Sequence, residues 1–153
     1  MKIALGSDHG GYELKETIKK HLEEKGYTVM DFGTHSESSC NYPDFALAVA
    51  EAVAKGEYER GILVCGTGIG ISIAANKVPG IRCALVSDSF SAKATRQHND
   101  SNVLALGGRV IGVGLALELV DIWLAEEFQG GRHKNRIDLI GDIEKKYFLN
   151  HKC

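Results

Sequence analysis

The sequence lacks an excess of charge of either sign. Its 18 basic and 20 acidic side chains leave a formal net charge of −2. Proteins that bind nucleic acids usually gather a basic surplus on one face, whereas here Lys and Arg are scattered among acidic residues, except in a short stretch near Arg132. The charge pattern therefore argues against a nucleic-acid-binding protein.

Long apolar runs and paired cysteines are also missing. No run approaches the roughly 18 apolar residues of a membrane-spanning helix, and residues 1–5 turn polar at Gly6, without the pattern of a signal peptide. The four cysteines, at positions 40, 65, 83 and 153, include no C-x-x-C pair. We therefore expect a cytoplasmic protein with reduced thiols and no membrane association.

The chain has no linker, internal repeat or low-complexity segment. A chain of 153 residues buries roughly 70% of the surface that its unfolded form exposes, which is enough for a substantial hydrophobic core. We therefore expect residues 1–153 to form a single domain.

Short aliphatic runs alternate with segments whose apolar residues recur at helical spacing. The expected strands are residues 2–5, 28–32, 62–65, 83–86 and 103–106, and the expected helices are residues 11–25, 43–56, 70–76, 89–98 and 113–128. This alternation predicts a parallel sheet covered by helices. The fold class is α/β, a three-layer αβα sandwich around a Rossmann- or flavodoxin-like five-stranded parallel sheet, in which ligands bind beyond the carboxyl ends of the strands.

A last amphipathic stretch, residues 137–149, follows after the sheet is complete. Its apolar residues include Leu139, Ile140 and Ile143. This apolar face has no obvious place to pack within the chain, and a second subunit would supply one. We therefore expect a C-terminal helix that packs on a partner subunit, in a homodimer or a tetramer.

The first expected strand leads into the segment SDHGG, residues 7–11. Asp8 and His9 thus stand at a strand end, beside glycines that let a ligand approach the backbone. Such a pair suits sugar hydroxyls or an anion. In the alternative interpretation Asp8 only caps the following helix and His9 is a turn residue.

Cys65 ends the third expected strand, and the glycine-rich segment GTGIG, residues 66–70, follows it. A thiol at this place faces backbone N–H groups and the positive end of a helix, which favour its use as a nucleophile or base. The same N–H groups can hold an oxyanion. The alternative is an ordinary buried cysteine, which is also the better explanation of Cys83.

Three familiar phosphate motifs are absent from this loop. A P-loop needs G-x-x-x-x-G-K-[ST], a dinucleotide fingerprint needs G-x-G-x-x-G, and a phosphatase loop needs an Arg where Ile71 stands. The loop therefore suits a ligand smaller than a nucleotide.

Further polar residues follow the later strands. His98 and Asn99 come at the end of the helix after the fourth strand, which we expect on the same edge as Cys65, and Arg109 follows the fifth strand. An imidazole can act as acid or base near pH 7, although a helix-capping role is the alternative for His98.

Arg132 and Arg136 lie four residues apart, so within a helix they share a face and can bind one phosphate. The alternative is a solvated run of charge. No spacing of His, Cys and Asp predicts a metal site. Four histidines belong to no recognisable group: His21, His35, His133 and His151.

Five segments, in this order, resemble the type B ribose-5-phosphate isomerase family. They are SDHGG at 7–11, NYPD at 41–44, CGTGIG at 65–70, RQHN at 96–99 and GGR at 107–109. With the Arg132 and Arg136 pair, the resemblance spans residue 3 to about residue 140. The wider family includes allose-6-phosphate isomerases and two-subunit galactose-6-phosphate isomerases.

The resemblance implies interconversion of ribose 5-phosphate and ribulose 5-phosphate through a cis-enediolate, with no metal or organic cofactor. Cys65 would move the proton between C2 and C1. Other family members carry a glutamate just after the third glycine, where this sequence has Ile71. The chain therefore resembles the thiol subtype.

The resemblance also implies roles for the remaining residues. The hydroxyl of Thr67 would stabilise the enediolate, His98 would open the sugar ring, and Asp8 would lie on the sugar oxygens. The substrate contacts implied are the loop N–H groups of Gly66, Gly68, Ile69 and Gly70, phosphate contacts by His9, Arg132 and Arg136, sugar contacts by Tyr42 and Asn99, and a contact across the subunit interface by Arg109.

Three other functions compete with this interpretation. A six-carbon sugar phosphate would change only the loop volume around residues 98–102, and the five-carbon substrate is favoured because one chain holds the full catalytic set. A non-catalytic phosphate-binding module would have no need of Cys65, His98 and the arginine pair together. A redox role for Cys65 is disfavoured because no resolving cysteine lies nearby in the sequence.

Overall fold

The computed structural model describes residues 1–149, so that His151 and Cys153 lie outside it. The strands are β1 (Lys2–Ser7), β2 (Thr28–Asp31), β3 (Arg60–Cys65), β4 (Cys83–Leu85) and β5 (Val103–Gly107). The helices are α1 (Tyr12–Glu24), α2 (Tyr42–Ala54), α3 (Ile69–Ala75), α4 (Ser89–Asn99), α5 (Val113–Ala125) and α6 (Arg132–Glu144). A 3₁₀ turn, His9–Gly11, precedes α1, and a π-helical turn, Lys145–Leu149, extends α6.

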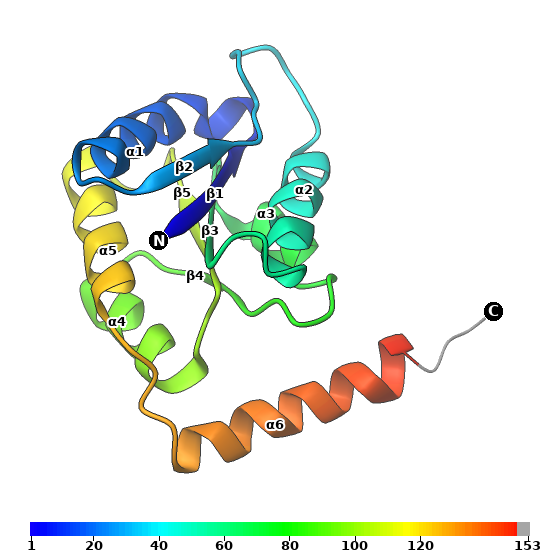
Figure 1. Ribbon diagram of the computed structural model, residues 1–153. Coiled ribbons are helices and arrows are strands. Elements are labelled where there is room, and N and C mark those ends of the chain that lie inside the picture. Colours follow the sequence, from blue (N-terminus) through cyan, green and yellow to red (C-terminus); the bar gives the residue numbers. More distant parts are fainter. Residues whose placement is uncertain (150–153) are drawn as a thin grey trace.

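All five strands pair in parallel, in the order β2-β1-β3-β5-β4 (Figure 1). Helices α1, α4 and α5 cover one face of the sheet, and α2 and α3 cover the other. The predicted α/β class, with a five-stranded parallel sheet between two helical layers, is therefore confirmed. The shared orientation of the strands gathers all their carboxyl ends at one edge of the sheet.

Alternation along the strands divides the core into two apolar layers. In β1, Ile3 and Leu5 face the α1 and α5 side, and Ala4 faces the α2 side. Trp123 of α5 is the largest fully buried side chain, and its indole N–H donates to the Ser101 hydroxyl at 2.8 Å. A buried indole thus keeps its hydrogen bond, as burial requires.

Several boundaries differ from those expected. β1 runs on to Ser7, and β3 begins at Arg60, because both strands continue their ladder beyond the apolar run. Helix α5 ends at Ala125, since Glu126 is extended. Helix α6 begins at Arg132 rather than at residue 137, so the basic segment forms its first turns.

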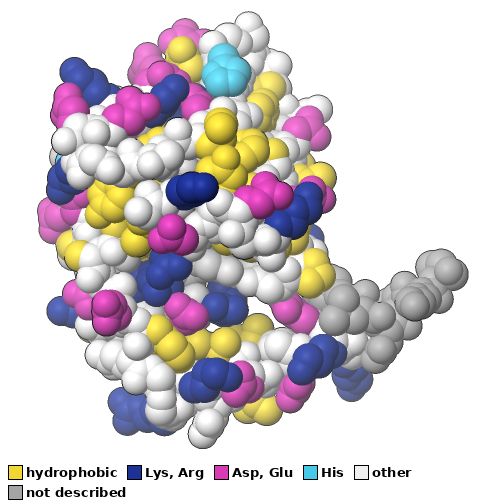
Figure 2. All heavy atoms as spheres, viewed as in Figure 1, with side chains coloured by type: hydrophobic (Ala, Val, Ile, Leu, Met, Phe, Trp, Pro, Cys, Tyr) yellow, Lys and Arg dark blue, Asp and Glu magenta, His cyan; other side chains and the backbone are white. Residues whose placement is uncertain are grey.

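Helix α6 lies beyond the edge of the sheet where the strands begin, and it extends away from the other helices (Figure 1). It exposes Leu139, Ile140 and Ile143, and Figure 2 shows hydrophobic side chains on this helix beside a hollow that separates it from the rest of the molecule. Glu144, near its end, accepts the backbone N–H of Gly80 at 3.1 Å. That this apolar face packs on a partner subunit stays a prediction. None of the helices within residues 1–149 combines the length and apolar character of a membrane span.

Candidate active site

The carboxyl ends of β1, β3 and β5 meet at one edge of the sheet. The N–H of Gly108 donates to the carbonyl of Cys65 at 2.8 Å, and the N–H of Arg109 donates to the carbonyl of Gly66 at 2.9 Å. A Cβ on Gly10 would lie 3.0 Å from the Gly66 nitrogen. These contacts show that the three strand ends pack directly against one another, as the parallel sheet predicted.

Cys65 is almost fully buried at the end of β3, with 4% of its surface exposed. The backbone N–H of Gly68 donates to its Sγ at 3.0 Å. The N–H of Ile69 donates to the Thr67 hydroxyl at 3.2 Å, which fixes that side chain beside the loop. An N–H aimed at sulfur stabilises negative charge that develops there.

Gly68 is a position that only glycine fits. Its φ is +76°, and a Cβ there would lie 2.4 Å from the Leu85 Cδ1 and 2.9 Å from the Leu106 carbonyl carbon. Similarly, a Cβ on Gly70 would lie 2.7 Å from the Tyr42 ring. The glycines therefore let the loop pack closely between β5 and the Tyr42 ring.

Asp8 acts as a cap in the structure. Its Oδ1 accepts the N–H groups of Gly10 at 2.9 Å and of Gly11 at 3.2 Å, so the capping interpretation of this residue is confirmed. His9 accepts the N–H of Cys40 through Nδ1 at 3.3 Å. In the neutral imidazole this bond places the proton on Nε2, which can then donate to a ligand. Nothing in the sequence singles out Cys40, because its contact with His9 depends on the course of the loop between β2 and α2.

That loop, between β2 and α2, is anchored by Asp31. The Oδ2 of Asp31 pairs with the fully buried Lys15 at 2.6 Å, and its Oδ1 accepts the N–H of Gly33 at 2.9 Å. Burial by itself would raise the pKa of Asp31, but the hydrogen bonds from Lys15 and Gly33 outweigh it and lower that pKa below its ordinary value. Ser7 donates its N–H to the Gly33 carbonyl at 2.7 Å, which ties the loop to β1.

A cavity of about 500 Å³ opens at the same edge of the sheet, and its lining includes His9, Gly10, Gly108 and Arg109. The guanidinium of Arg109 lies beside Gly66 of its own chain, since a Cβ on Gly66 would come within 3.6 Å of the Arg109 Nη1. The chain thus holds Arg109 together with Cys65, Thr67, Asp8, His9 and Tyr42. We call this group the carboxyl-edge half.

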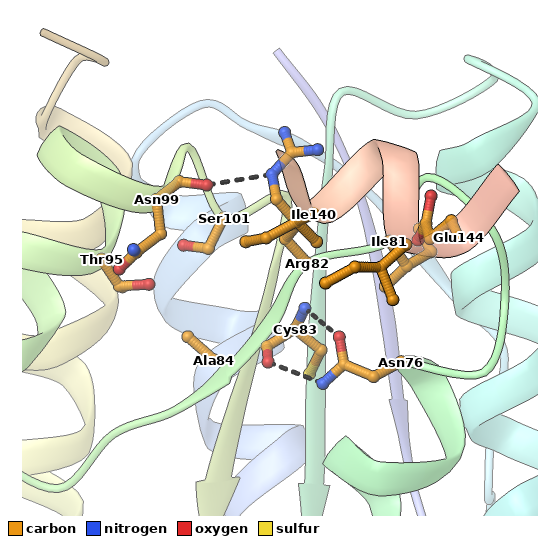
Figure 3. A pocket seen from close by; sticks show the side chains of 11 residues that line it. Asn76, Ile81, Arg82, Cys83, Ala84, Thr95, Asn99, Ser101, Ile140 and Glu144 are labelled. Carbon is orange, nitrogen blue, oxygen red and sulfur yellow. Dashed lines mark hydrogen bonds between the residues drawn. The ribbon is translucent and has the colours of Figure 1, made fainter. Parts of the chain in front are cut away.

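The expectation that His98 and Asn99 lie on the same edge as Cys65 is wrong. Helix α4 starts after β4, and it runs back to the amino end of the sheet. There the Nε of Arg82, just before β4, donates to the Asn99 carbonyl at 2.9 Å (Figure 3). The helix of a βα unit returns antiparallel to its strand, so the end of the helix reaches the opposite edge.

Buried charge fixes the turn after α4. Arg96 donates through Nη1 to the Asp100 carboxylate at 2.8 Å and to the Ser101 carbonyl at 2.6 Å. Asp100 itself has a φ of +45° and also pairs with Arg82 at 3.1 Å. These contacts hold the backbone next to His98 and Asn99.

His133 of α6 lies directly beside His98. The His98 and His133 rings stack with centroids 4.3 Å apart and planes 8° from parallel. Burial lowers the pKa of His133, and the positive charges of His98, Arg132 and Arg136 lower it further. No pattern in the sequence indicated this contact, because the last helix was predicted to begin at residue 137, five residues after its actual start.

Arg132 and Arg136 are exposed in the first turns of α6, as their spacing of four predicted. We call His98, Asn99, Arg132, His133 and Arg136 the amino-edge half. Within one chain it lies at the opposite edge of the sheet from the carboxyl-edge half. Residues 1–149 contain no cluster of three or more His, Cys, Asp or Glu side chains arranged to hold a metal ion.

A second cavity, of about 410 Å³, lies between α6 and the edge strand β4 (Figure 3). Cys83 lines it, and burial raises the pKa of this thiol to about 12. The Asn76 side chain accepts the Cys83 N–H at 2.8 Å and donates to its carbonyl at 2.9 Å. Cys83 is therefore half-buried rather than fully buried, with its backbone paired, and it stays a thiol near neutral pH.

Residues 3–140 match the sequence model of a family described as Ribose/Galactose Isomerase. Ribose-5-phosphate isomerase B of Escherichia coli (strain K12) is 53% identical over 145 residues, which cover 95% of this chain and 97% of the relative.

Solved structures agree with the sequence relatives. Clostridium thermocellum ribose-5-phosphate isomerase B is 62% identical, with a TM-score of 0.96 over 96% of this chain and 99% of that one. Mycoplasma genitalium ribose-5-phosphate isomerase B, solved with bound ribulose 5-phosphate, is 43% identical, with a TM-score of 0.91 over 95% of this chain and 97% of that one.

Proposed function

The chain belongs to the ribose/galactose isomerase family and is an isomerase, and on this basis we propose that it interconverts D-ribose 5-phosphate and D-ribulose 5-phosphate. The observation that carries the proposal is the buried Cys65 thiol, with the Gly68 N–H on its sulfur, at the strand edge where the glycine-rich loop begins. The relative solved with bound ribulose 5-phosphate supports this choice of substrate.

The reaction moves one proton between neighbouring carbons. In the open-chain aldose, the Cys65 thiolate takes the proton from C2, the C2–H electrons form the C1–C2 double bond, and the carbonyl oxygen on C1 becomes an oxyanion. The thiol then returns the proton to C1, the proton of the C2 hydroxyl passes to the C1 oxyanion, and the C2 oxygen becomes the carbonyl of the ketose. No redox partner is needed, because the two carbons exchange oxidation states within one molecule.

The enediolate oxygens need donors already in place. The loop that follows Cys65 supplies the backbone N–H groups of Gly66, Thr67 and Gly70 and the Thr67 hydroxyl. The remaining two N–H groups hold the site together, that of Gly68 on the Cys65 sulfur and that of Ile69 on the Thr67 hydroxyl. Donors that are fixed before the reaction stabilise developing charge without reorganising. This loop is the natural place for the enediolate.

Ribose 5-phosphate is mostly a closed furanose, so the ring must open first. Opening breaks the bond between C1 and the ring oxygen, gives a proton to that oxygen and removes the proton of the C1 hydroxyl. His98 is the acid–base group for this step, and Asp8 lies on the sugar oxygens. Because His98 stands at the opposite edge of the sheet from Cys65 in one chain, the two must come from different subunits.

We therefore propose a homodimer with shared active sites. Each site joins the carboxyl-edge half of one chain to His98 of the partner subunit and the rest of its amino-edge half. The phosphate lies against His9 of one chain and against Arg132 and Arg136 of the partner subunit. Helix α6, which exposes Leu139, Ile140 and Ile143, supplies apolar surface for this assembly.

One relative favours a second candidate, the same chemistry on a six-carbon sugar phosphate. A galactose-6-phosphate isomerase subunit LacB of Clostridium acetobutylicum is 42% identical over 137 residues. It covers 90% of this chain. The two candidates share every step and differ in the room left for one more carbon.

The test is turnover of ribose 5-phosphate by the purified protein with EDTA present, beside allose 6-phosphate and galactose 6-phosphate. We expect the highest kcat/KM on the pentose. A preference for a hexose would keep the mechanism and replace the substrate. Loss of pentose turnover in EDTA, restored by a divalent cation, would contradict the metal-free mechanism.

A further inference from the structure

His98 stacks on His133, and the proposed reaction steps give His133 no role. The two rings come from separate helices, the end of α4 and the first turn of α6. His133 is 7% exposed, an unusual degree of burial for a histidine that pairs with no acidic group in its stack. Its position beside His98 therefore calls for a role.

The chain between α5 and α6 is tied down next to His98. The backbone N–H of Gln129 donates to the carbonyl of Gln97 at 3.0 Å, and the Gln97 side chain donates to Glu126 at 2.6 Å. The N–H of His133 donates to the Gly130 carbonyl at 3.1 Å. These bonds bring the start of α6 onto the end of α4 and set the register in which the two rings meet.

A parallel stack uses the faces of both rings. The nitrogens of an imidazole lie on its edge, so contact with the face of His133 leaves both nitrogens of His98 free to meet a sugar oxygen. The same contact restricts rotation of the His98 ring about its side-chain bonds. A half-buried histidine at a helix end would otherwise sample several rotamers.

Positive charge on both rings of the stack is unfavourable. Two imidazolium ions whose centroids lie 4.3 Å apart repel each other, so the stack disfavours a state in which both rings are charged. Arg132 and Arg136 add positive charge on the side of His133, and its burial also disfavours the charged form. Burial and these charges therefore favour the neutral form of the His133 ring.

We propose that His133 is a positioning residue for ring opening, whose neutral ring face holds the His98 imidazole with its nitrogens toward the furanose oxygen. The inference rests on the proposed function, because it assigns His133 to one step of that reaction. It predicts that ring opening needs a flat ring at position 133 but does not need the nitrogens of that ring.

The test compares His133→Phe, which keeps a flat ring, with His133→Leu, which fills the space without one. For kcat/KM on ribose 5-phosphate we expect His133→Phe within about twofold of the wild type and His133→Leu lower by about tenfold, the scale of one lost aromatic stack. Both variants fill the buried site, and their melting curves check that each is folded.

A measurement on a substrate without a sugar ring separates a role in ring opening from a general loss of activity. Ribulose 5-phosphate carries its phosphate on O5 and cannot close a furanose, so deuterium uptake at its C1 in D₂O reports the enediolate step alone. We expect this uptake to be unchanged in His133→Leu. The matched control is His21→Leu, at a histidine of α1 that pairs with Asp121 of α5, and it should change neither rate.

Three results would overturn the inference. The Phe and Leu variants could both turn over ribose 5-phosphate at the wild-type rate, both could lose activity equally, or His133→Leu could lose deuterium uptake as much as turnover. An equal loss in both variants would assign the His133 nitrogens to a polar contact. A wild type that does not turn over ribose 5-phosphate would instead contradict the proposed function.

Discussion

The backbone N–H of Gly68 donates to the Cys65 sulfur at 3.0 Å. This bond joins the candidate base to the loop that is to stabilise its product, so one short segment controls both. The sulfur accepts the bond in a nearly closed environment, and the loop cannot move without changing the surroundings of the thiol.

Replacing Cys65 with alanine removes the candidate base. We expect kcat to fall by about 10³-fold, the scale of general base catalysis, while phosphate binding is retained. Steady-state kinetics and binding of inorganic phosphate would measure the two effects. Cys83→Ala is the matched control, since that half-buried thiol lies at the other cavity, and its kcat should stay near that of the wild type. Near-normal turnover by Cys65→Ala would remove Cys65 from the reaction.

Gly68→Ala tests the close packing of the loop. The new Cβ would meet Leu85 at 2.4 Å and the Leu106 backbone at 2.9 Å, in addition to its strained φ. Gly80→Ala carries a similar φ of +83° with nothing within 4 Å. We expect Gly80→Ala to cost about 1 kcal/mol of unfolding free energy and to leave kcat unchanged. Gly68→Ala should cost more and also lower kcat, as measured by denaturant unfolding and kinetics, and equal effects at both sites would contradict this.

Arg132→Ala should weaken substrate binding. Arg132 is exposed at the start of α6, and a charged hydrogen bond to phosphate is worth about 1.5–3 kcal/mol, so KM should rise by about 10- to 100-fold with a smaller change in kcat. Lys134→Ala on the same helix, where the lysine pairs with Asp138, is the control and should leave KM unchanged. An unchanged KM for Arg132→Ala would favour the interpretation of a solvated run of charge.

The buried pair of Lys15 and Asp31 should dominate acid sensitivity. Asp31→Asn leaves Lys15 buried with only the exposed Glu16, and we expect a loss of about 3 kcal/mol in unfolding free energy at pH 7. Glu24→Gln, which breaks the exposed pair with Lys20, is the control and should cost less than about 0.5 kcal/mol.

The pH dependence of this pair has a defined sign. The folded pKa of Asp31 lies below its ordinary value of 3.8, so its stabilisation is fully present above that value. As the pH falls from there toward the folded pKa, the unfolded chain takes up the proton first and the stabilisation is lost. Urea unfolding between pH 3 and pH 7 should show a shallower acid loss in Asp31→Asn than in the wild type, and parallel curves would contradict the assignment.

The sheet and the carboxyl-edge half were predictable because both follow from local patterns. Apolar runs and helical spacing identified every strand and helix, and parallel strands bring Asp8, Cys65 and Arg109 to one edge by geometry alone. The glycine spacing also located the loop whose Gly68 contacts the thiol. Each of these predictions depends on residues close together in the sequence or on a single rule of topology.

The amino-edge half was only partly predictable. The position of His98 follows from topology as well, since a helix between two parallel strands ends at the edge where the next strand begins, and the expectation that placed His98 beside Cys65 did not apply that rule. Arg82, just before β4, marks this edge through its hydrogen bond to the Asn99 carbonyl. His133 was missed because the start of α6 is fixed by contacts such as that of Gln129 with Gln97, about 30 residues apart in the chain. Tertiary contacts of this kind leave no periodic signal.

Separation of Cys65 and His98 onto opposite edges gives the sharpest test of the shared site. We expect the homodimers of Cys65→Ala and of His98→Ala each to be nearly inactive. In a heterodimer of the two, one site joins an intact Cys65 to His98 of the partner subunit, and the other site lacks both groups. Such a heterodimer, purified with two affinity tags after co-expression, should have about half of the wild-type activity.

The control pairs two variants from the same half. A heterodimer of Cys65→Ala with Asp8→Ala places one defect in each site, because Asp8 and Cys65 lie at the same edge of one chain. Its activity should stay near that of the impaired parents. Recovery in this control would mean that Asp8 and Cys65 of one site come from different chains. No recovery in the pair of Cys65→Ala with His98→Ala would mean that each chain builds its site alone, and helix α4 would then have to bring His98 to the carboxyl edge by a rearrangement that its contacts with Arg82 oppose.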